Sequence, residues 1–115
     1  YLNRGNVFQE MSLCVEALID YNKCISLKPD YARGYYNKAI LLQELQRVEE
    51  ALNEYDMAIS LGLEFAELYN DRGIALTDMK NWSEAIKSFE IANFFNPNFH
   101  ESFFNKGNVY LKIKN

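Results

Sequence analysis

Hydrophobic, small and polar residues are arranged along the chain in a pattern that returns every 34 residues. Each cycle has a large hydrophobic residue, two small residues that flank an aromatic one, and a closing residue: Phe8, Ala17, Tyr21, Cys24 and Pro29; then Leu42, Ala51, Tyr55, Ala58 and Leu63; then Leu76, Ala85, Phe89, Ala92 and Pro97. No residue is inserted or lost across the three cycles. The sequence therefore predicts an array of one repeated unit, whose long shared surface suits binding better than chemistry.

Each cycle contains two amphipathic helical patterns. In the first, hydrophobic residues are separated by four and then by three positions, as at Tyr35, Ala39 and Leu42. The second carries a similar stripe that includes Ala51 and Tyr55. The spacing predicts seven helices and no strand, with the helices near residues 1–11, 15–27, 32–45, 49–61, 66–79, 83–95 and 100–113.

Helix-breaking residues lie between these patterns. Pro29 and Pro97 follow second helices and prevent their continuation. In the middle cycle Gly62 takes that place as a helix stop. Asn81 and Ser83 are expected to be a turn residue and a helix N-cap respectively.

Small residues occupy equivalent positions in the helices. On first helices they are Gly5, Ala39, Gly73 and Gly107, and on second helices they are Ala17, Ala51 and Ala85. A glycine inside a helix costs about 1 kcal/mol relative to alanine, so we expect a steric reason for each one. The missing side chains let paired helices approach closely, and the aromatic residues Tyr21, Tyr55 and Phe89 fill the gap towards the next unit.

These residues together resemble the motif of a tetratricopeptide repeat array. That motif runs from an aromatic residue to Gly or Ala four positions on, then a large residue, Ala, an aromatic residue, Ala and Pro. Here it reads Tyr1, Gly5, Phe8, Ala17, Tyr21, Cys24 and Pro29; Tyr35, Ala39, Leu42, Ala51, Tyr55 and Ala58, with Leu63 in place of the usual proline; Tyr69, Gly73, Leu76, Ala85, Phe89, Ala92 and Pro97; and Phe103, Gly107 and Tyr110 in a final half-repeat.

The resemblance implies an all-α fold of the α-α superhelix class, a solenoid of antiparallel helix pairs. Its concave face would be lined by the first helices. The expected organisation is a single array over 1–115, with an N-terminally truncated repeat at 1–31, repeats at 32–65 and 66–99, and a terminal helix at 100–115.

Composition and charge disfavour some classes of binding partner. The chain has 115 residues, a net charge of −4 and a pI of about 5.0. This balance argues against duplex DNA and anionic membranes, which both reward clustered Lys and Arg. No apolar run reaches the length of a membrane span, and no signal-peptide pattern is present.

The two cysteines are not expected to pair. Cys14 and Cys24 are read as lying on one helix, where ten residues separate them by about 15 Å, too far for a disulfide. Cys24 takes the position of Ala58 and Ala92, so a small buried side chain is favoured over a redox role. Reduced thiols fit a cytoplasmic setting.

The first helices are expected to form columns of residues across the concave face. One column is Asn3, Asn37, Asp71 and Asn105. A carboxamide carries both a donor and an acceptor, so it can pair with a peptide backbone of any sequence. By resemblance, similar asparagine ladders in the repeat region of O-linked GlcNAc transferases grip peptides. The alternative is that these are ordinary solvated residues.

A second column is acidic. It consists of Glu10, Glu44 and Asp78, with Glu67, Asp71 and Glu101 on or beside the same face and Arg33 and Lys112 as the expected cations. Such a groove would favour neutral or basic segments of a partner and repel acidic ones. The alternative is a solvated charged face that keeps the array soluble.

Chaperone-tail binding is disfavoured by the same residues. Repeat arrays that bind the acidic C-termini of heat-shock chaperones use a carboxylate clamp of three cations and two asparagines. The resemblance places that clamp at Leu2, Asn6, Asn37, Glu67 and Asp71. The two asparagines match, but all three cations are missing and two are replaced by acids.

A third column, Arg4, Lys38, Arg72 and Lys106, lies at the edge of the core stripe. The long stems are expected to cover apolar surface while the charges reach water or an acid such as Glu16, Glu50 or Glu84. The rival interpretation is phosphate or nucleic-acid binding. Tyr36 and Phe104 either flank the groove as anchors for a partner side chain or pack at the edge of the core.

Nothing in the sequence indicates catalysis, a cofactor or a metal. His100 is the only histidine, and neither a Cys/His cluster nor a phosphate-binding glycine loop is present. We therefore expect a protein-interaction scaffold or adaptor that binds an extended peptide or partner surface. The alternatives are a non-catalytic substrate-selecting segment of a larger enzyme, such as a glycosyltransferase, and a scaffold that self-associates through its solenoid ends. The predicted groove residues are Asn3, Asn6, Glu10, Arg33, Tyr36, Asn37, Glu44, Glu67, Asn70, Asp71, Asp78, Phe104, Asn105 and Asn108.

Overall fold

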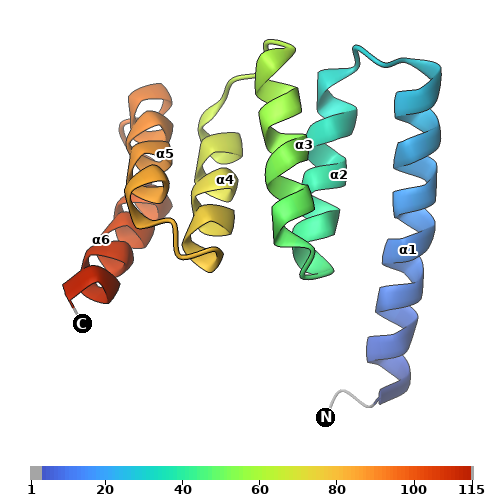
Figure 1. The fold of residues 1–115 in the computed structure, drawn as a ribbon, viewed down its shortest axis with the longest axis horizontal. Helices are drawn as coiled ribbons and strands as arrows, with labels where there is room; N and C mark the ends of the chain where they lie inside the picture. The colour runs from blue at the N-terminus through green and yellow to red at the C-terminus, as the bar shows by residue number, and fades with distance from the viewer. Residues whose placement is uncertain (1–3, 115) are drawn as a thin grey trace. The chain divides into compact units, whose positions relative to one another are not determined.

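The computed structural model describes the backbone of residues 4–114 and the side chains of residues 11–114. Within this part of the chain there are six α-helices, where the periodicity predicts seven, and no strand, as it predicts (Figure 1). The helices are α1 (Arg4–Leu27), α2 (Ala32–Glu44), α3 (Val48–Ser60), α4 (Ala66–Asp78), α5 (Trp82–Phe95) and α6 (His100–Lys114). From α2 onward, each helix begins and ends within one residue of the bounds expected from the sequence.

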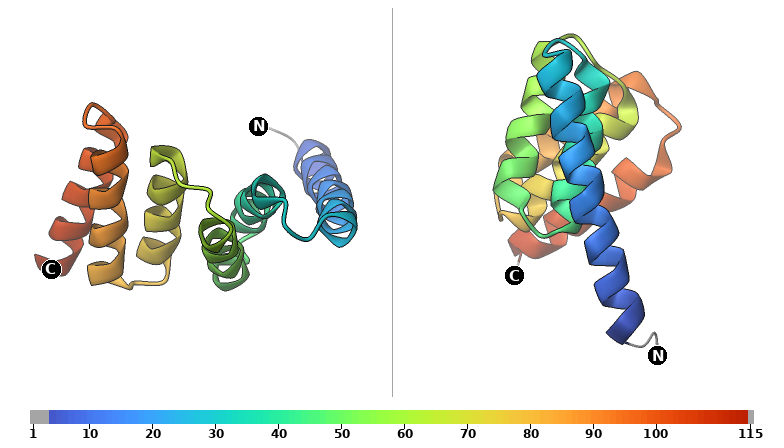
Figure 2. Two further views of the ribbon diagram at one scale, coloured as in Figure 1. Left: turned by 90° about the horizontal axis from the view of Figure 1, so that it is seen from above. Right: turned by 90° about the vertical axis from the view of Figure 1, so that its right-hand side faces the viewer.

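The prediction of two separate helices at 1–11 and 15–27 is wrong. Both stretches belong to the continuous helix α1, whose N-terminal half extends beyond α2 in Figures 1 and 2. In the later cycles, the turn between paired helices is made by Gln46 and Lys80, which have φ angles of 65° and 61°. The equivalent residue is Ser12, which stays helical in a stretch without glycine, proline or asparagine. The sequence around Ser12 thus contains no signal that stops a helix.

The chain divides into two compact units, Tyr1–Leu61 and Gly62–Asn115. In the first unit, α2 packs between α1 and α3. The ring of Tyr55 on α3 is fully buried, lies 6.1 Å from the ring of Tyr36, and its hydroxyl donates to Oε1 of Gln43 at 2.6 Å. Ala39 and Ala58 are also fully buried, which confirms that small residues lie where these helices meet.

In the second unit, α5 packs against both α4 and α6. A Cβ atom at Gly73 of α4 would stand 2.5 Å from the ring of Phe89 on α5, so the expected close approach is present. Two further fully buried residues, Ser102 and Val109, lie on α6. The rings of Tyr69 and Phe95 stack with their centroids 5.7 Å apart.

Gly107, unlike Gly73, does not lie at a close contact between two helices. It is exposed on α6, and nothing would lie within 4 Å of a Cβ atom built there. The expected helix contact at this position is therefore wrong for the structure as it stands. The physical reason is that no second helix packs on this face of α6 among the described residues.

The helix ends are mostly as expected. Gly62 has a φ of +96° immediately after the C-cap of α3, which confirms it as a helix stop. Pro29 and Pro97 lie in the turns after α1 and α5. The assignment of the N-cap to Ser83 is wrong, because α5 begins at Trp82 and its N-cap is Asn81, whose side chain makes no capping bond.

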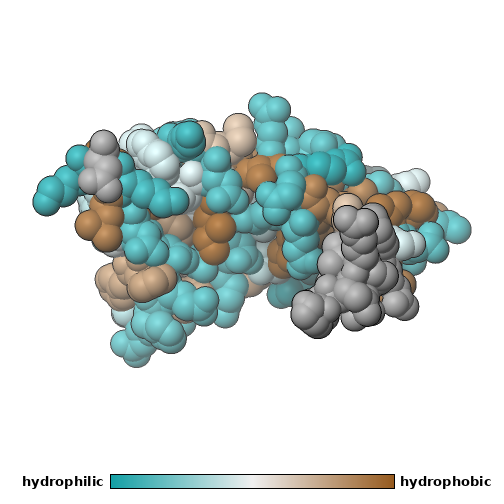
Figure 3. Space-filling model, turned by 90° about the horizontal axis from the view of Figure 1, so that it is seen from below, coloured by the Kyte–Doolittle hydropathy of each residue, from teal (hydrophilic) through white to brown (hydrophobic). Residues whose placement is uncertain are grey.

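The surface is mixed in character. Figure 3 shows one face on which hydrophobic patches are separated by hydrophilic residues. No helix in the described range 4–114 is long and apolar enough to cross a lipid bilayer.

Candidate functional site

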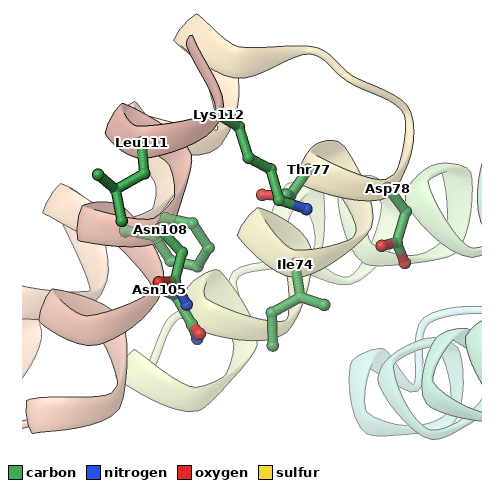
Figure 4. Close-up of a pocket in the computed structure, with 8 residues that line it drawn as sticks. Ile74, Thr77, Asp78, Asn105, Asn108, Leu111 and Lys112 are labelled. Atoms are coloured by element: carbon green, nitrogen blue, oxygen red, sulfur yellow. The ribbon is translucent and has the colours of Figure 1, made fainter. Parts of the chain in front are cut away.

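A pocket of about 310 Å³ opens between α4 and α6 in the second unit (Figure 4). Its lining combines apolar, amide and charged side chains: Ile74, Thr77, Asp78, Phe89, Asn105, Asn108, Leu111 and Lys112. More apolar than polar surface faces the pocket, so it can remove an apolar group from water.

Helical spacing brings the lining residues together. Ile74, Thr77 and Asp78 are three and four residues apart on α4, so they share one face of that helix. Asn105, Asn108 and Lys112 are similarly spaced on α6. Figure 4 shows the Lys112 side chain extending from α6 towards α4.

An amide pair links the two helices at one side of the pocket. Nδ2 of Asn105 on α6 donates to Oδ1 of Asn70 on α4 at 3.1 Å, and Asn70 is only 4% exposed. A carboxamide has two donor hydrogens and one acceptor oxygen. The bond to Asn70 uses one donor of Asn105 and fixes the orientation of its amide.

The polar groups at the pocket have different hydrogen-bonding roles. The Thr77 hydroxyl donates to the carbonyl of Gly73 at 2.8 Å, so it is used within α4. Asp78 is exposed at the end of α4, and Lys112 lies in the last turn of α6. The apolar lining is thus accompanied by one acidic and one basic group.

The predicted site residues of the second unit divide between the pocket and its surroundings. Asp78, Asn105 and Asn108 line the pocket together. Asn70 is buried behind Asn105, while Asp71 is half-buried on α4. Two further predicted residues are exposed outside the lining: Glu67, in the first turn of α4, and Phe104, on α6.

The predicted residues of the first unit lie mainly on α2. The Arg33 guanidinium lies 5.9 Å from the ring centroid of Tyr36, which is 7% exposed. This burial against Tyr55 favours core packing over the interpretation of Tyr36 as an open anchor. Asn37 is half-buried, and Glu44 is exposed at the end of α2, where its carboxylate accepts a weak hydrogen bond from the Cys14 thiol at 3.9 Å.

Three of the predicted residues fall at the N-terminus. Asn3 lies outside the described residues. Asn6 and Glu10 belong to α1, and their side chains also lie outside the described part. The prediction that these residues line a groove therefore stays a prediction.

The basic column packs as expected, but with different partners. Lys38 pairs with Glu54 at 3.5 Å, and Lys106 pairs with Glu90 at 3.6 Å. Arg72 donates to the hydroxyl of Ser88 at 2.6 Å. The ion pairs of Lys38 and Lys106 are thus made with Glu54 and Glu90, while Glu50 pairs with Arg47 and Glu84 with Lys87. The Arg4 side chain lies outside the described part.

Sequence reasoning missed part of the pocket. Leu111 is 62% exposed although it is large and hydrophobic, and a helical wheel could have placed it beside Asn108. The sequence contained no comparable indication that Thr77 would line the pocket. Phe89 was assigned to the core, where it is 1% exposed, and it also contributes to the lining of the pocket.

Neither metal nor disulfide chemistry is indicated by the described side chains. In the range 11–114 no group of three His, Cys, Asp or Glu residues is placed to hold a metal ion. Cys14 and Cys24 both lie on α1 as free, half-buried thiols.

Comparison with solved structures defines the class of the fold. The chain is similar to YrrB, a TPR protein with an unusual peptide-binding site (TM-score 0.80, 23% identity, covering 90% of this chain and 54% of YrrB). It is also similar to the first TPR of Spaghetti (RPAP3) bound to the HSP90 peptide SRMEEVD (TM-score 0.86, 21% identity, covering 97% of this chain and 89% of that chain). A third match is the second TPR domain of human RPAP3 in complex with the HSP70 peptide SGPTIEEVD (TM-score 0.80, 24% identity, covering 93% of this chain and 89% of that chain). The fold is therefore an all-α array of the α-α superhelix class.

Sequence comparison agrees with this class. The family model of the tetratricopeptide repeat matches residues 20–53, a stretch one cycle long. No curated protein matches the sequence at a significant level. The family model and the structural neighbours agree on this class, and the helices of the described residues fit three tetratricopeptide repeats and a terminal helix. It spans about half the length of YrrB.

Proposed function

We propose that the chain is a non-catalytic protein-interaction module that binds an extended peptide segment, with one apolar side chain of that segment in the pocket between α4 and α6. The pocket carries this proposal. Its volume of about 310 Å³ lies at the lower end of the range of about 300–1,000 Å³ for ligand sites, which suits a side chain better than a large cofactor.

The lining gives each part of a peptide a partner. Ile74, Leu111 and the ring of Phe89 offer apolar contact to a side chain such as leucine, methionine or phenylalanine. Asn105 and Asn108 offer amide groups to the peptide backbone beside it. Backbone pairing gives affinity for many sequences, and the pocket adds a preference for a hydrophobic residue at one position.

Charge supports neutral or basic partners over acidic ones. The two RPAP3 structures hold peptides that end in EEVD. At the positions where the clamp of such arrays carries cations, this chain has Glu67 and Asp71, both on α4 of the pocket unit. Acidic side chains there repel an acidic tail, so we propose that the natural ligand lacks one.

A library of peptides tests the proposal. We expect selected sequences to share one large hydrophobic residue and no acidic C-terminal run. Leu111→Asp should reduce their affinity at least tenfold, because it places a charge in the apolar wall. The matched control is Leu27→Asp, which changes another exposed leucine, 79% exposed against 62% for Leu111, at the end of α1 and should leave affinity unchanged. Equal affinity of the two variants would show that the pocket is not the binding site.

A further inference from the structure

The terminal helix α6 carries a face that is buried at the equivalent positions of α4 and exposed here. Phe103, Gly107 and Tyr110 occupy the positions of Tyr69, Gly73 and Leu76 on α4. Tyr69 and Leu76 are 6% and 5% exposed, whereas Phe103 and Tyr110 are each 51% exposed. The difference arises because α5 covers α4, while no helix in the described part of the chain covers this face of α6.

Helix α1 carries the complementary face. Ala17, Tyr21 and Cys24 occupy the positions of Ala85, Phe89 and Ala92 on α5. Those three residues of α5 are at most 1% exposed, but their equivalents on α1 are all only half-buried. Because α1 runs straight through Ser12, its N-terminal half does not fold back over this face.

We propose that the Gly107 face of α6 binds the α1 face of a second copy of this chain, so that two chains complete one repeat between them. In this arrangement Tyr21 of the second copy covers Gly107, as Phe89 covers Gly73 within one chain. The space at Gly107 is open, since nothing lies within 4 Å of a Cβ atom built there.

Charge complementarity supports an alignment of α6 with α1 of the second copy that matches the alignment of paired helices within one chain. In the first unit, Lys38 pairs with Glu54 at 3.5 Å, and in the second unit Arg72 bonds Ser88 from the same two repeat positions. The corresponding residues of the proposed contact are Lys106 on α6 and Asp20 on α1. They carry opposite charges, Asp20 is exposed, and Lys106, which lies 3.6 Å from Glu90 of its own chain, would be shared between the two acids.

The proposed contact leaves the peptide pocket open. On a helical wheel at 100° per residue, the centre of the face formed by Phe103, Gly107 and Tyr110 lies roughly 150° from the mean direction of Asn108 and Lys112. The polar lining residues of α6 therefore point away from the second copy, and Leu111 lies at the boundary between the two surfaces. The contact is head-to-tail, so each chain added leaves one free α6 face and one free α1 face, and assembly continues unless a ring closes.

The test is the mass of the purified chain as a function of concentration, measured by sedimentation velocity and light scattering. We expect the mass to rise beyond that of a dimer as concentration increases. Gly107→Leu fills the open space at an exposed position and should reduce the association constant at least tenfold. The control Glu101→Leu adds the same side chain elsewhere on the exposed surface of α6 and should not. A wild-type chain that stays monomeric would overturn the proposal.

A mixing experiment identifies the occupant. Gly107→Leu keeps the α1 face, and Tyr21→Ala keeps the α6 face. Each variant alone should be monomeric, and an equimolar mixture should form a dimer and nothing larger. If Tyr21→Ala lowers the helix content, the charge pair replaces it: Asp20→Lys and Lys106→Asp should each weaken association, and the double variant should restore it. Association lost with Gly107→Leu but unchanged by both α1 substitutions would overturn the proposal, because something other than α1 would then cover α6.

Discussion

The ring of Phe89 occupies the space that any side chain at Gly73 would need. Three ring atoms lie 2.5–2.8 Å from a Cβ atom built on that glycine, closer than real contacts allow. Phe89 is 1% exposed, so the ring has little room to move away. The close approach of α4 and α5 therefore depends on the absence of a side chain at residue 73.

Two glycine substitutions test this relationship. Gly73→Leu should lower the free energy of unfolding by about 1–3 kcal/mol or more, because it overpacks the α4–α5 contact. Gly107→Leu should leave the stability of the monomer equal or slightly higher, because leucine favours a helix and the site is open. Chemical denaturation at low protein concentration measures both. Equal midpoints for the two variants would contradict the assigned helix faces.

A salt bridge at the start of α3 predicts a pH effect. Nε and Nη2 of Arg47 each donate to the Glu50 carboxylate at 2.8 Å, and these hydrogen bonds lower the pKa of Glu50 below its ordinary value. A lowered folded-state pKa means that the stabilisation is present above the unfolded-state pKa and is lost as pH falls through the folded value. The pair is exposed, so the change in stability should be small.

NMR titration of the Glu50 carboxyl carbon measures that pKa directly. Arg47→Gln should raise it towards the ordinary value, whereas Lys87→Gln, which removes a cation paired with Glu84 in the other unit, should leave it unchanged. A Glu50 pKa that does not respond to the loss of Arg47 would mean that the bidentate pair does not persist in solution.

The asparagine column predicts a backbone contact in the first unit as well. If the peptide extends over α2, Asn37→Ala should weaken binding by about 1–3 kcal/mol, the value of two hydrogen bonds together. The loss should be similar for ligands of different sequence, since the backbone is common to all. Calorimetry with a selected peptide checks this, with Asn53→Ala on the exposed surface of α3 as control. Unchanged affinity would restrict the binding surface to other residues.

The charge of the pocket rim predicts partner preference. Asp78→Lys should weaken binding of basic peptides and strengthen that of acidic ones, and the difference should shrink at high salt. Asp78 is exposed at the end of α4, so the fold should tolerate the change. Glu49→Lys, an equal charge reversal on the exposed surface of α3, is the control and should not change the ranking of peptides.

The sequence predicted those features that depend on local spacing. The 34-residue period and the small residues around Tyr55 and Phe89 predict the helices from α2 to α6 and the buried faces of α2 to α5. On α6 the buried residues are instead Ser102 and Val109. The turn at Ser12 was predicted only from the repeat period, and the local residues do not support a turn there. Helix α1 is continuous because no residue near Ser12 stops it.

The pocket could not be predicted from residue spacing alone. A helical wheel places Asp78 and Asn108 on the outer faces of their helices, but the opening between them depends on how α6 packs on α5 and α4. The burial of Tyr36 is also a tertiary effect, because it results from contact with Tyr55 on the next helix. Neighbouring tyrosines in one helix do not reveal which of them will be covered.

The chain has a single tryptophan, and Trp82 lies half-buried in the first turn of α5. Its fluorescence therefore reports on the unit Gly62–Asn115 alone, whereas the circular dichroism of the helices reports on both units. If the two signals change at the same denaturant concentration, the units unfold cooperatively. If fluorescence changes at a different concentration, the protein is not two-state, and the cost of each substitution has to be assigned to the unit that carries it.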